Sequence, residues 1–323
     1  MRITFTKIFT LIFMIIFVFS CEENQDYDEW LIISSIDKNI NSIYFIDSQN
    51  GWVVGDSGYI SYTSDGGYTW TKQNSMTNSK LKSIYFLDNN TGFACGYNNT
   101  LIHTDDKGNT WMPIQVVSDS GSIYSSINSD NDGNLYFISN YGEVYWSNNL
   151  GVTWNNKHNF DNWGFSYLDF SNNPICYAMQ TMGKYLHKTN DGGNSWSIYT
   201  IPLQWSGDIY FFDKDHGWIT ENLVPSSMIH NSTSVYMTND GGLTWVQQSS
   251  LSGLVLNNIV FVDIFHGWVS GVTEIYYTTD NGKSWTRQFK SDDEGYIKDI
   301  YFIDSNTGWA ITSEGIVIKY NCD

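Results

Sequence analysis

One eight-residue motif recurs six times in this chain and constrains its fold more than any other feature. The first copy spans residues 63–70, from Thr63 to Trp70, and the later copies end at Trp111, Trp154, Trp196, Trp245 and Trp285. These closing tryptophans are 41, 43, 42, 49 and 40 residues apart. A fixed period near forty residues is typical of propeller blades or solenoid turns. We therefore expect stacked repeats.

A second motif precedes the octet and completes the repeat. In the first repeat it runs from Ile43 to Asp47 and continues with Gly51 and Trp52, and related runs begin at Ile84, Ile209, Ile259 and Ile300. Both pieces are short, rich in aromatic and β-branched residues, and bounded by Asn, Asp and Gly, which is typical of strands. The repeat therefore predicts strands A, B, C and D at residues 43–46, 52–54, 59–63 and 69–73, with the octet turning C into D. Four antiparallel strands make one propeller blade.

The two motifs differ in number, and the difference predicts how the ring closes. There are six octets, but seven leading motifs if residues 122–128 and 167–170 form degenerate first strands. The last repeat reaches its strand C at residues 316–320 without a fourth strand, whereas residues 30–33 resemble a strand D without its turn. We predict an all-β, seven-bladed propeller over residues 30–323, closed by this N-terminal strand so that no edge stays open.

The first residues predict export. Arg2 and Lys7 flank the start of an apolar run that is too short to span a bilayer comfortably and that ends in Ser20-Cys21, the pattern of a lipoprotein cleavage box. Residues 1–20 are therefore a predicted signal peptide, Cys21 the lipid attachment residue, and residues 21–29 an acidic solvated tether. An uncleaved anchor or an ordinary secretory signal is the alternative. We expect a cell-envelope protein anchored to the outer membrane, facing the periplasm or the outside.

Net charge limits the classes of partner, and the cysteine content indicates free thiols. The full chain carries −18, and loss of Arg2 and Lys7 with the signal peptide makes the mature chain two units more negative. Such a surface repels nucleic acid and anionic headgroups, so no nucleic-acid partner is expected and membrane contact is through the anchor alone. Besides Cys21, the odd and irregularly spaced Cys95, Cys176 and Cys322 favour buried free thiols over a disulfide framework.

The octet resembles the Asp-box, also called the BNR repeat. Together with the leading motifs it resembles the photosystem II assembly factor family of Ycf48 and Hcf136, over residues 42–320. This resemblance implies a seven-bladed propeller that acts without catalysis and binds a membrane-protein intermediate. Members of that family use an arginine-rich basic patch, whereas Arg287 is the only arginine of the mature chain. The fold and a protein-binding ring carry over, but not the partner.

Asp boxes also occur in enzymes, and the residues weigh against both candidate classes. Sialidases clamp a sugar carboxylate with three arginines, which excludes that chemistry here. Other glycoside hydrolases need a carboxylate pair about 5–10 Å apart. The obvious aspartates recur once per blade, so we predict structural turn roles for them and no catalytic residue. They are the Asp-box residues Asp65, Asp106, Asp191, Asp240 and Asp280, with Asn149 in the slot of blade three, and the leader residues Asp47, Asp88, Asp213, Asp263 and Asp304.

Two histidines raise the question of a metal. His216 and His266 take equivalent places in the A–B turns of blades five and six. A metal site also needs a third ligand and convergent geometry, so turn or surface histidines are favoured and neither metal nor cofactor is predicted.

Parts that do not repeat are the best candidates for binding. The D–A and B–C connections emerge opposite the octets, and variable loops on a rigid scaffold commonly carry binding sites. Phe160, Trp163 and Trp205 lie in such connections and form the candidate binding face; alternatively these aromatics plug the gaps above their blades. We expect an interaction or assembly scaffold for another envelope or secreted protein. The alternative is a protein that binds or cleaves carbohydrate.

Overall fold

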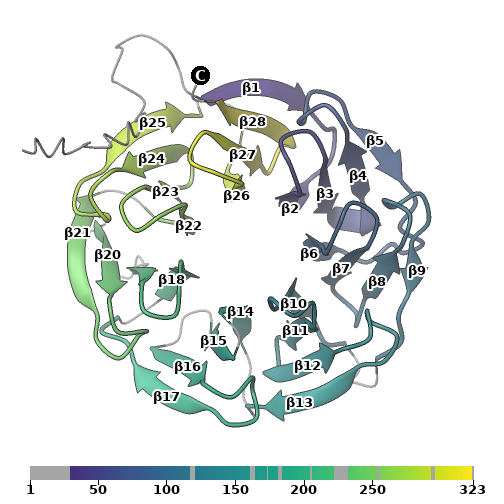
Figure 1. The fold of residues 1–323 in the computed structure, drawn as a ribbon. Coiled ribbons are helices and arrows are strands. Elements are labelled where there is room, and N and C mark those ends of the chain that lie inside the picture. Colours follow the sequence, from purple (N-terminus) through teal and green to yellow (C-terminus); the bar gives the residue numbers. More distant parts are fainter. Residues whose placement is uncertain are drawn as a thin grey trace, which may run out of the picture.

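The computed structural model is a closed ring of seven four-stranded antiparallel sheets (Figure 1). It describes residues 30–116, 121–160, 164–172, 174–180, 184–203, 206–221, 232–252, 255–291 and 295–321. In six of the sheets the first strand lies next to the central axis and the last strand on the outer rim, and in the seventh the outer strand is the N-terminal one. The predicted all-β, seven-bladed propeller is confirmed.

The first four blades follow the chain in order. From inner to outer strand they are β2 (Ile40–Phe45), β3 (Gly51–Gly55), β4 (Ile60–Thr63) and β5 (Thr71–Gln73); β6 (Leu81–Phe86), β7 (Gly92–Gly96), β8 (Leu101–Thr104) and β9 (Met112–Pro113); β10 (Tyr124–Ser129), β11 (Leu135–Ser139), β12 (Glu143–Ser147) and β13 (Asn155–Asn159); and β14 (Phe165–Asn172), β15 (Ile175–Gln180), β16 (Tyr185–Thr189) and β17 (Ser197–Thr200). The degenerate first strands expected for blades three and four are β10 and β14.

The last three blades complete the ring. They are β18 (Ser206–Phe211), β19 (Gly217–Glu221), β20 (Ser232–Thr238) and β21 (Val246–Ser252); β22 (Asn258–Phe261), β23 (Gly267–Ser270), β24 (Glu274–Thr278) and β25 (Thr286–Lys290); and β26 (Ile297–Phe302), β27 (Thr307–Thr312), β28 (Ile316–Asn321) and β1 (Trp30–Ser35). Among the described residues, one 3-10 turn, η1 (Asp56–Gly58), links β3 to β4.

The predicted closure is present in blade seven. β1 pairs antiparallel with β28, from Trp30 opposite Tyr320 to Ser35 opposite Ile316. An N-terminal strand thus supplies the outer position of the blade formed by the C-terminal strands, and the first and last described strands meet there (Figure 1). This pairing joins the ring by hydrogen bonds between residues almost 300 positions apart in sequence.

Seven apolar clusters fill the spaces between the sheets, one at each blade boundary. Alternation along the strands explains this, because successive side chains of a strand point to opposite faces of its sheet. The cluster between blades seven and one, for example, joins Trp309 and Ile311 to Ile43, Phe45 and Val53. The core is therefore a ring of seven similar interfaces.

The ring has two unlike faces. We call the face with the A–B and C–D turns the box face, and the face with the D–A and B–C connections the loop face. Strand D begins two residues later than expected, since Thr69 and Trp70 precede β5 and Trp70 packs between the sheets of blades seven and one. Cys95 and Cys176 are buried and free, as predicted, whereas Cys322 lies outside the described residues. Within the described part of the chain, no helix is long and apolar enough to cross a membrane.

Candidate functional site

The octet folds into one compact turn. In blade one, Asp65 accepts hydrogen bonds from the Thr69 backbone N–H at 2.9 Å and from the Thr69 hydroxyl at 2.6 Å. The Thr63 hydroxyl donates to Asp65 at 2.8 Å and accepts from the backbone N–H of Gly67 at 3.0 Å. Burial opposes the effect, but these bonds from Thr69 and Thr63 lower the pKa of Asp65. The carboxylate is therefore occupied by its own turn.

The same contacts recur in all four remaining octets that carry an aspartate. The residue two positions before the carboxylate donates to it, and the residue four positions after it donates through both backbone and side chain; the carboxylates concerned are Asp106, Asp191, Asp240 and Asp280. In blade three, Asn149 accepts from the Thr153 N–H and donates to its hydroxyl. One neutral side chain can thus replace the carboxylate without changing the turn.

The Gly-Trp leader joins neighbouring blades. Phe45 of blade one stacks on Trp309 of blade seven, with ring centroids 3.6 Å apart. A Cβ atom on Gly51 would lie 2.5 Å from the Phe45 ring, so only glycine leaves room for this stack. The indole of Trp309 also donates to the carbonyl of Gly66, in the octet of blade one, at 2.9 Å. The leader of one blade therefore contacts both the inner strand and the octet of the next blade, and we call this set of contacts the joint between the two blades.

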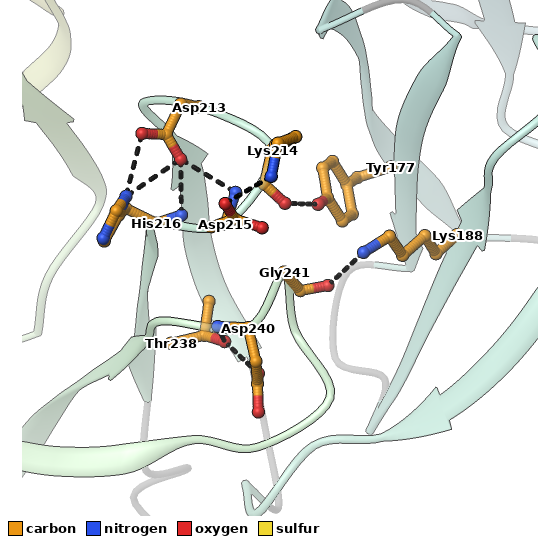
Figure 2. Close-up of polar contacts among 9 residues, drawn as sticks. All are labelled: Tyr177, Lys188, Asp213, Lys214, Asp215, His216, Thr238, Asp240 and Gly241. Atoms are coloured by element: carbon orange, nitrogen blue, oxygen red, sulfur yellow. Dashed lines mark hydrogen bonds and ion pairs between the residues drawn. The ribbon is translucent and has the colours of Figure 1, made fainter.

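Blade four uses a variant of this joint. Tyr177 replaces the tryptophan, stacks on Phe211 at 3.5 Å, and donates its hydroxyl to the Lys214 carbonyl (Figure 2). Beside it, Lys188 crosses the blade boundary and donates to the Gly241 carbonyl of the next octet at 2.8 Å (Figure 2).

The leader aspartates serve the A–B turns, and two of them also hold the histidines. Asp213 accepts from the backbone N–H and from Nδ1 of His216, and Asp263 does the same for His266 (Figure 2 shows the first pair). Asp47, Asp88 and Asp304 likewise accept backbone N–H groups of their own turns. Each imidazole thus faces its own turn. Among the described residues, no group of three or more His, Cys, Asp or Glu side chains is placed to hold a metal ion.

Tyrosines surround the axis of the ring. Tyr44 lies 5.3 Å from Tyr85 and 5.2 Å from Tyr301, ring centroid to ring centroid, on the inner strands of blades one, two and seven. The Tyr44 hydroxyl donates to the carbonyl of Phe86 at 2.9 Å. Tyr44 thus satisfies a carbonyl on the open edge of the next inner strand, and the three rings fill space near the axis.

Two partly buried carboxylates on the inner strands were not among the predicted residues. Asp208 accepts from the backbone N–H of Ile259 at 3.0 Å, and Asp299 accepts from that of Ile43 at 3.1 Å. Burial raises the pKa of Asp208 to about 6 and that of Asp299 to about 7, against the hydrogen bonds that favour ionisation. A signal existed in the sequence: the matching position is serine in the first three blades, at Ser42, Ser83 and Ser126. Both carboxylates bind the neighbouring blade, which favours a structural role.

Of the three aromatic residues predicted to form a binding face, the structure describes only Phe160. Phe160 packs at the boundary of blades three and four, with its ring centroid 4.6 Å from Phe165, 4.5 Å from His187 and 5.0 Å from Trp196. It is only partly exposed, as expected for an aromatic residue that plugs a gap between blades. Trp163 and Trp205 lie outside the described residues, as does Cys21.

The loop face carries exposed tyrosines that the repeat does not require. Tyr296 is 61% exposed and lies in the connection from blade six to seven. Tyr97, Tyr141 and Tyr185 are also exposed, at the B–C turns of blades two, three and four. Tyrosine offers apolar area and a polar hydroxyl together, which suits a protein-binding surface.

A lysine cluster occupies the same face across blades seven, one and two. It comprises Lys38, Lys72, Lys80, Lys82 and Lys298. Lys80 forms an ion pair with Asp56 at 2.9 Å, and the positive charges of Lys80 and Lys298 help to lower the pKa of Asp56 against its burial. Lys38, Lys72 and Asp56 line one cavity of about 390 Å³. Lys298 lines a second cavity of about 560 Å³ with Val272, Tyr296 and Ile297.

Aspartates and lysines are distributed unequally over the two faces, although Lys214 and Lys283 also lie on the box face. The two repeated sets of turn aspartates lie on the box face, whereas the loop face gathers five of the 16 lysine and arginine residues of the chain in one cluster. A net charge of −18 thus leaves room for a local basic region. A basic region exists, but it is built from lysine rather than arginine.

Fold and turn chemistry together define a seven-bladed Asp-box β-propeller. Comparison with known proteins makes this more specific. Residues 22–166 match the family model described as photosynthesis system II assembly factor YCF48. The chain is thus an Asp-box propeller that resembles the Ycf48 family. Among curated protein sequences, none matches the chain.

Solved structures support the fold. A structure of YCF48 bound to a D1 peptide has a TM-score of 0.76 and 20% identity, covering 92% of this chain and 96% of that chain. YCF48 from Cyanidioschyzon merolae has a TM-score of 0.75 and 17% identity, covering 90% and 98%. The GH74 xyloglucanase from Xanthomonas campestris has a TM-score of 0.70 and 13% identity, and covers 91% of this chain but only 54% of the enzyme. At these identities the likeness concerns the fold alone.

Proposed function

We propose that this chain is a non-enzymatic, lipid-anchored envelope protein that binds a segment of another protein on its loop face. The observation that carries the proposal is the gathering of exposed tyrosines and lysines on the loop face, because neither set takes part in the repeat. On the box face, by contrast, the repeated aspartates are already engaged in hydrogen bonds within their own turns. Resemblance to the Ycf48 family supports a scaffold or assembly role, and one similar structure holds a peptide.

The route of the chain supports the choice of face. Outer strands run from the box face to the loop face, so Trp30 lies at the box-face end of β1 and Ser35 at the loop-face end. A tether over residues 21–29 would therefore leave from the box face. Anchored in this way, the ring would present its loop face away from the membrane.

The face is tested by matched surface variants. Tyr97→Ser with Tyr296→Ser alters the loop face, and Tyr68→Ser with Phe265→Ser alters exposed aromatics of the box face. After crosslinking in intact cells, the loop-face variant should capture about tenfold less of the main partner, since two lost aromatic anchors cost more than 1.4 kcal/mol. The box-face variant should capture it as the wild type does. Equal capture by both variants, or loss only in the box-face variant, contradicts the proposal.

Lipid attachment is tested separately. Metabolic labelling with a fatty acid should modify the wild type and leave a Cys21→Ser variant unlabelled and released from membranes. Labelling of the Cys21→Ser variant would contradict the proposed anchor. Turnover of a polysaccharide by the purified propeller would favour the carbohydrate alternative.

A further inference from the structure

Two lysines of the cluster hold equivalent places on inner strands. Lys298 is the second residue of β26 and Lys82 the second residue of β6, and Asn41 takes this place in β2 between them. At each of these places the pairing with the next strand shifts by one residue. Such bulges redirect a side chain away from the regular alternation. Two cations and one amide therefore follow each other around the loop-face end of the axis.

Within the described residues, neither Lys82 nor Lys298 forms an ion pair, although the charge of Lys298 is felt by Asp56. Lys80 has Asp56 as partner, and Asp56 also accepts from Asn41 at 3.0 Å, so its acceptor capacity is shared. Burial lowers the pKa of Lys82, and the charges of Lys80 and Lys298 lower it further. The nearby thiol of Cys95 does not compensate, because burial raises its pKa to about 12 and keeps it neutral. A partly desolvated ammonium without an anion gains from a ligand that brings one.

The surroundings indicate which kind of anion fits. Beside Lys298, the cavity of about 560 Å³ is open to solvent, and the exposed side chains of Val272 and Tyr296 supply its apolar surface. At the other end, the backbone N–H of Tyr97 bonds to the Lys80 carbonyl, which places this exposed tyrosine next to the cluster. A chain with alternating carboxylates and apolar side chains can use the lysines and the cavity together, whereas an acidic polysaccharide has no apolar side chain to bury.

We propose that the lysine cluster binds an acidic, partly apolar peptide segment, with Lys82 and Lys298 pairing two of its carboxylates and the cavity beside Tyr296 holding an apolar side chain. This inference rests on the proposed function and specifies its partner. The strong negative charge of the whole ring does not prevent such binding, because at physiological salt charges more than about 8 Å apart are largely screened.

The test is a binding titration with defined peptides. A fluorescent Glu-Leu-Glu-Leu-Glu peptide should bind the wild-type propeller about tenfold more tightly than Gln-Leu-Gln-Leu-Gln, and added salt should weaken it. Lys82→Gln with Lys298→Gln should lower the affinity for the acidic peptide about tenfold. The matched control, Lys214→Gln with Lys283→Gln, removes the same charge from the box face and should bind as the wild type does.

Three results would overturn the assignment. They are equal binding of the two peptides, equal weakening by the two double variants, and tighter binding of polygalacturonate than of the acidic peptide, which would point to an acidic glycan. Failure here is distinguishable from failure of the proposed function. If the tyrosine variant loses the cellular partner and the lysine variant keeps it, the loop face is right and the lysine assignment wrong.

Discussion

Trp30 meets Phe302 edge to face, with ring centroids 5.7 Å apart and an angle of 87° between the planes. In blade one, Trp70 of the octet meets Phe45 in the same way, at 6.2 Å and 77°. Blade seven has no octet, so the N-terminal strand supplies both the missing strand and the missing tryptophan. The Trp30 indole also donates to Gln288 of blade six at 3.2 Å. Closure of the ring therefore reproduces the side-chain packing of the repeat.

Truncation of Trp30 should destabilise the blade that closes the ring. Trp30 is 2% exposed, and Trp30→Ala should lower the free energy of unfolding by about 3–5 kcal/mol, as for other buried aromatic side chains. Leu31→Ala is the matched control, since Leu31 is 56% exposed on the same strand and should cost little. Urea unfolding measures both. Equal effects of the two substitutions would show that β1 closes the ring through its backbone alone.

The leader glycine should be intolerant of a single methyl group. In Gly51→Ala the new Cβ would lie 2.5 Å from Phe45 and push it off Trp309, which should cost about 1–3 kcal/mol of unfolding free energy. Gly271→Ala provides the control, because its Cβ would meet no atom nearer than 3.6 Å and its φ is not positive. Thermal unfolding should separate the two variants, and a Gly51→Ala protein as stable as Gly271→Ala would refute this account of the joint.

The Asp-box should accept asparagine but not alanine. Blade three already uses Asn149, so Asp106→Asn should keep the turn, whereas Asp106→Ala loses bonds from Thr104 and Thr110 and should cost about 1 kcal/mol. Hydrogen bonds from Thr110 lower the pKa of Asp106, so the wild-type turn should lose stability as the pH falls below 4, and the asparagine variant should not. Urea unfolding across this range gives the comparison. An alanine variant as stable as asparagine would remove the case for a turn role.

The sequence predicts the parts of this molecule that repeat. Period, strand positions and the missing strand D fix the number of blades and their closure, because each unit must bury its faces against its neighbours. Residues that depart from the repeat are harder to assign. Lys82 and Lys298 are far apart in sequence, and only closure of the ring brings blades two and seven to the sides of blade one. Phe160 illustrates a different difficulty. An exposed aromatic anchor and an aromatic packed between two blades look alike in sequence, and Phe160 packs against Phe165 and His187 at the boundary of blades three and four.

Asp299 should make the ring sensitive to pH in the direction opposite to the turn aspartates. Its pKa is raised by burial from 3.8 to about 7, so the folded protein holds a proton that the unfolded chain releases. The free energy of unfolding should therefore fall as the pH rises from about 4 to 7, by roughly 1–4 kcal/mol for this group. Asp299→Asn is neutral throughout and can still accept from the Ile43 N–H, so it should lack this fall and be the more stable protein at pH 8. Asp47→Asn is the control: burial opposes the effect, but bonds from Asn50 and Gln49 lower the pKa of Asp47, so this carboxyl is ionised above pH 5 whether the chain is folded or not and its variant should keep the wild-type pH dependence. Urea unfolding at pH 5 and pH 8 decides the matter: an Asp299→Asn variant with the pH dependence of the wild type would mean that Asp299 is ionised in the closed ring.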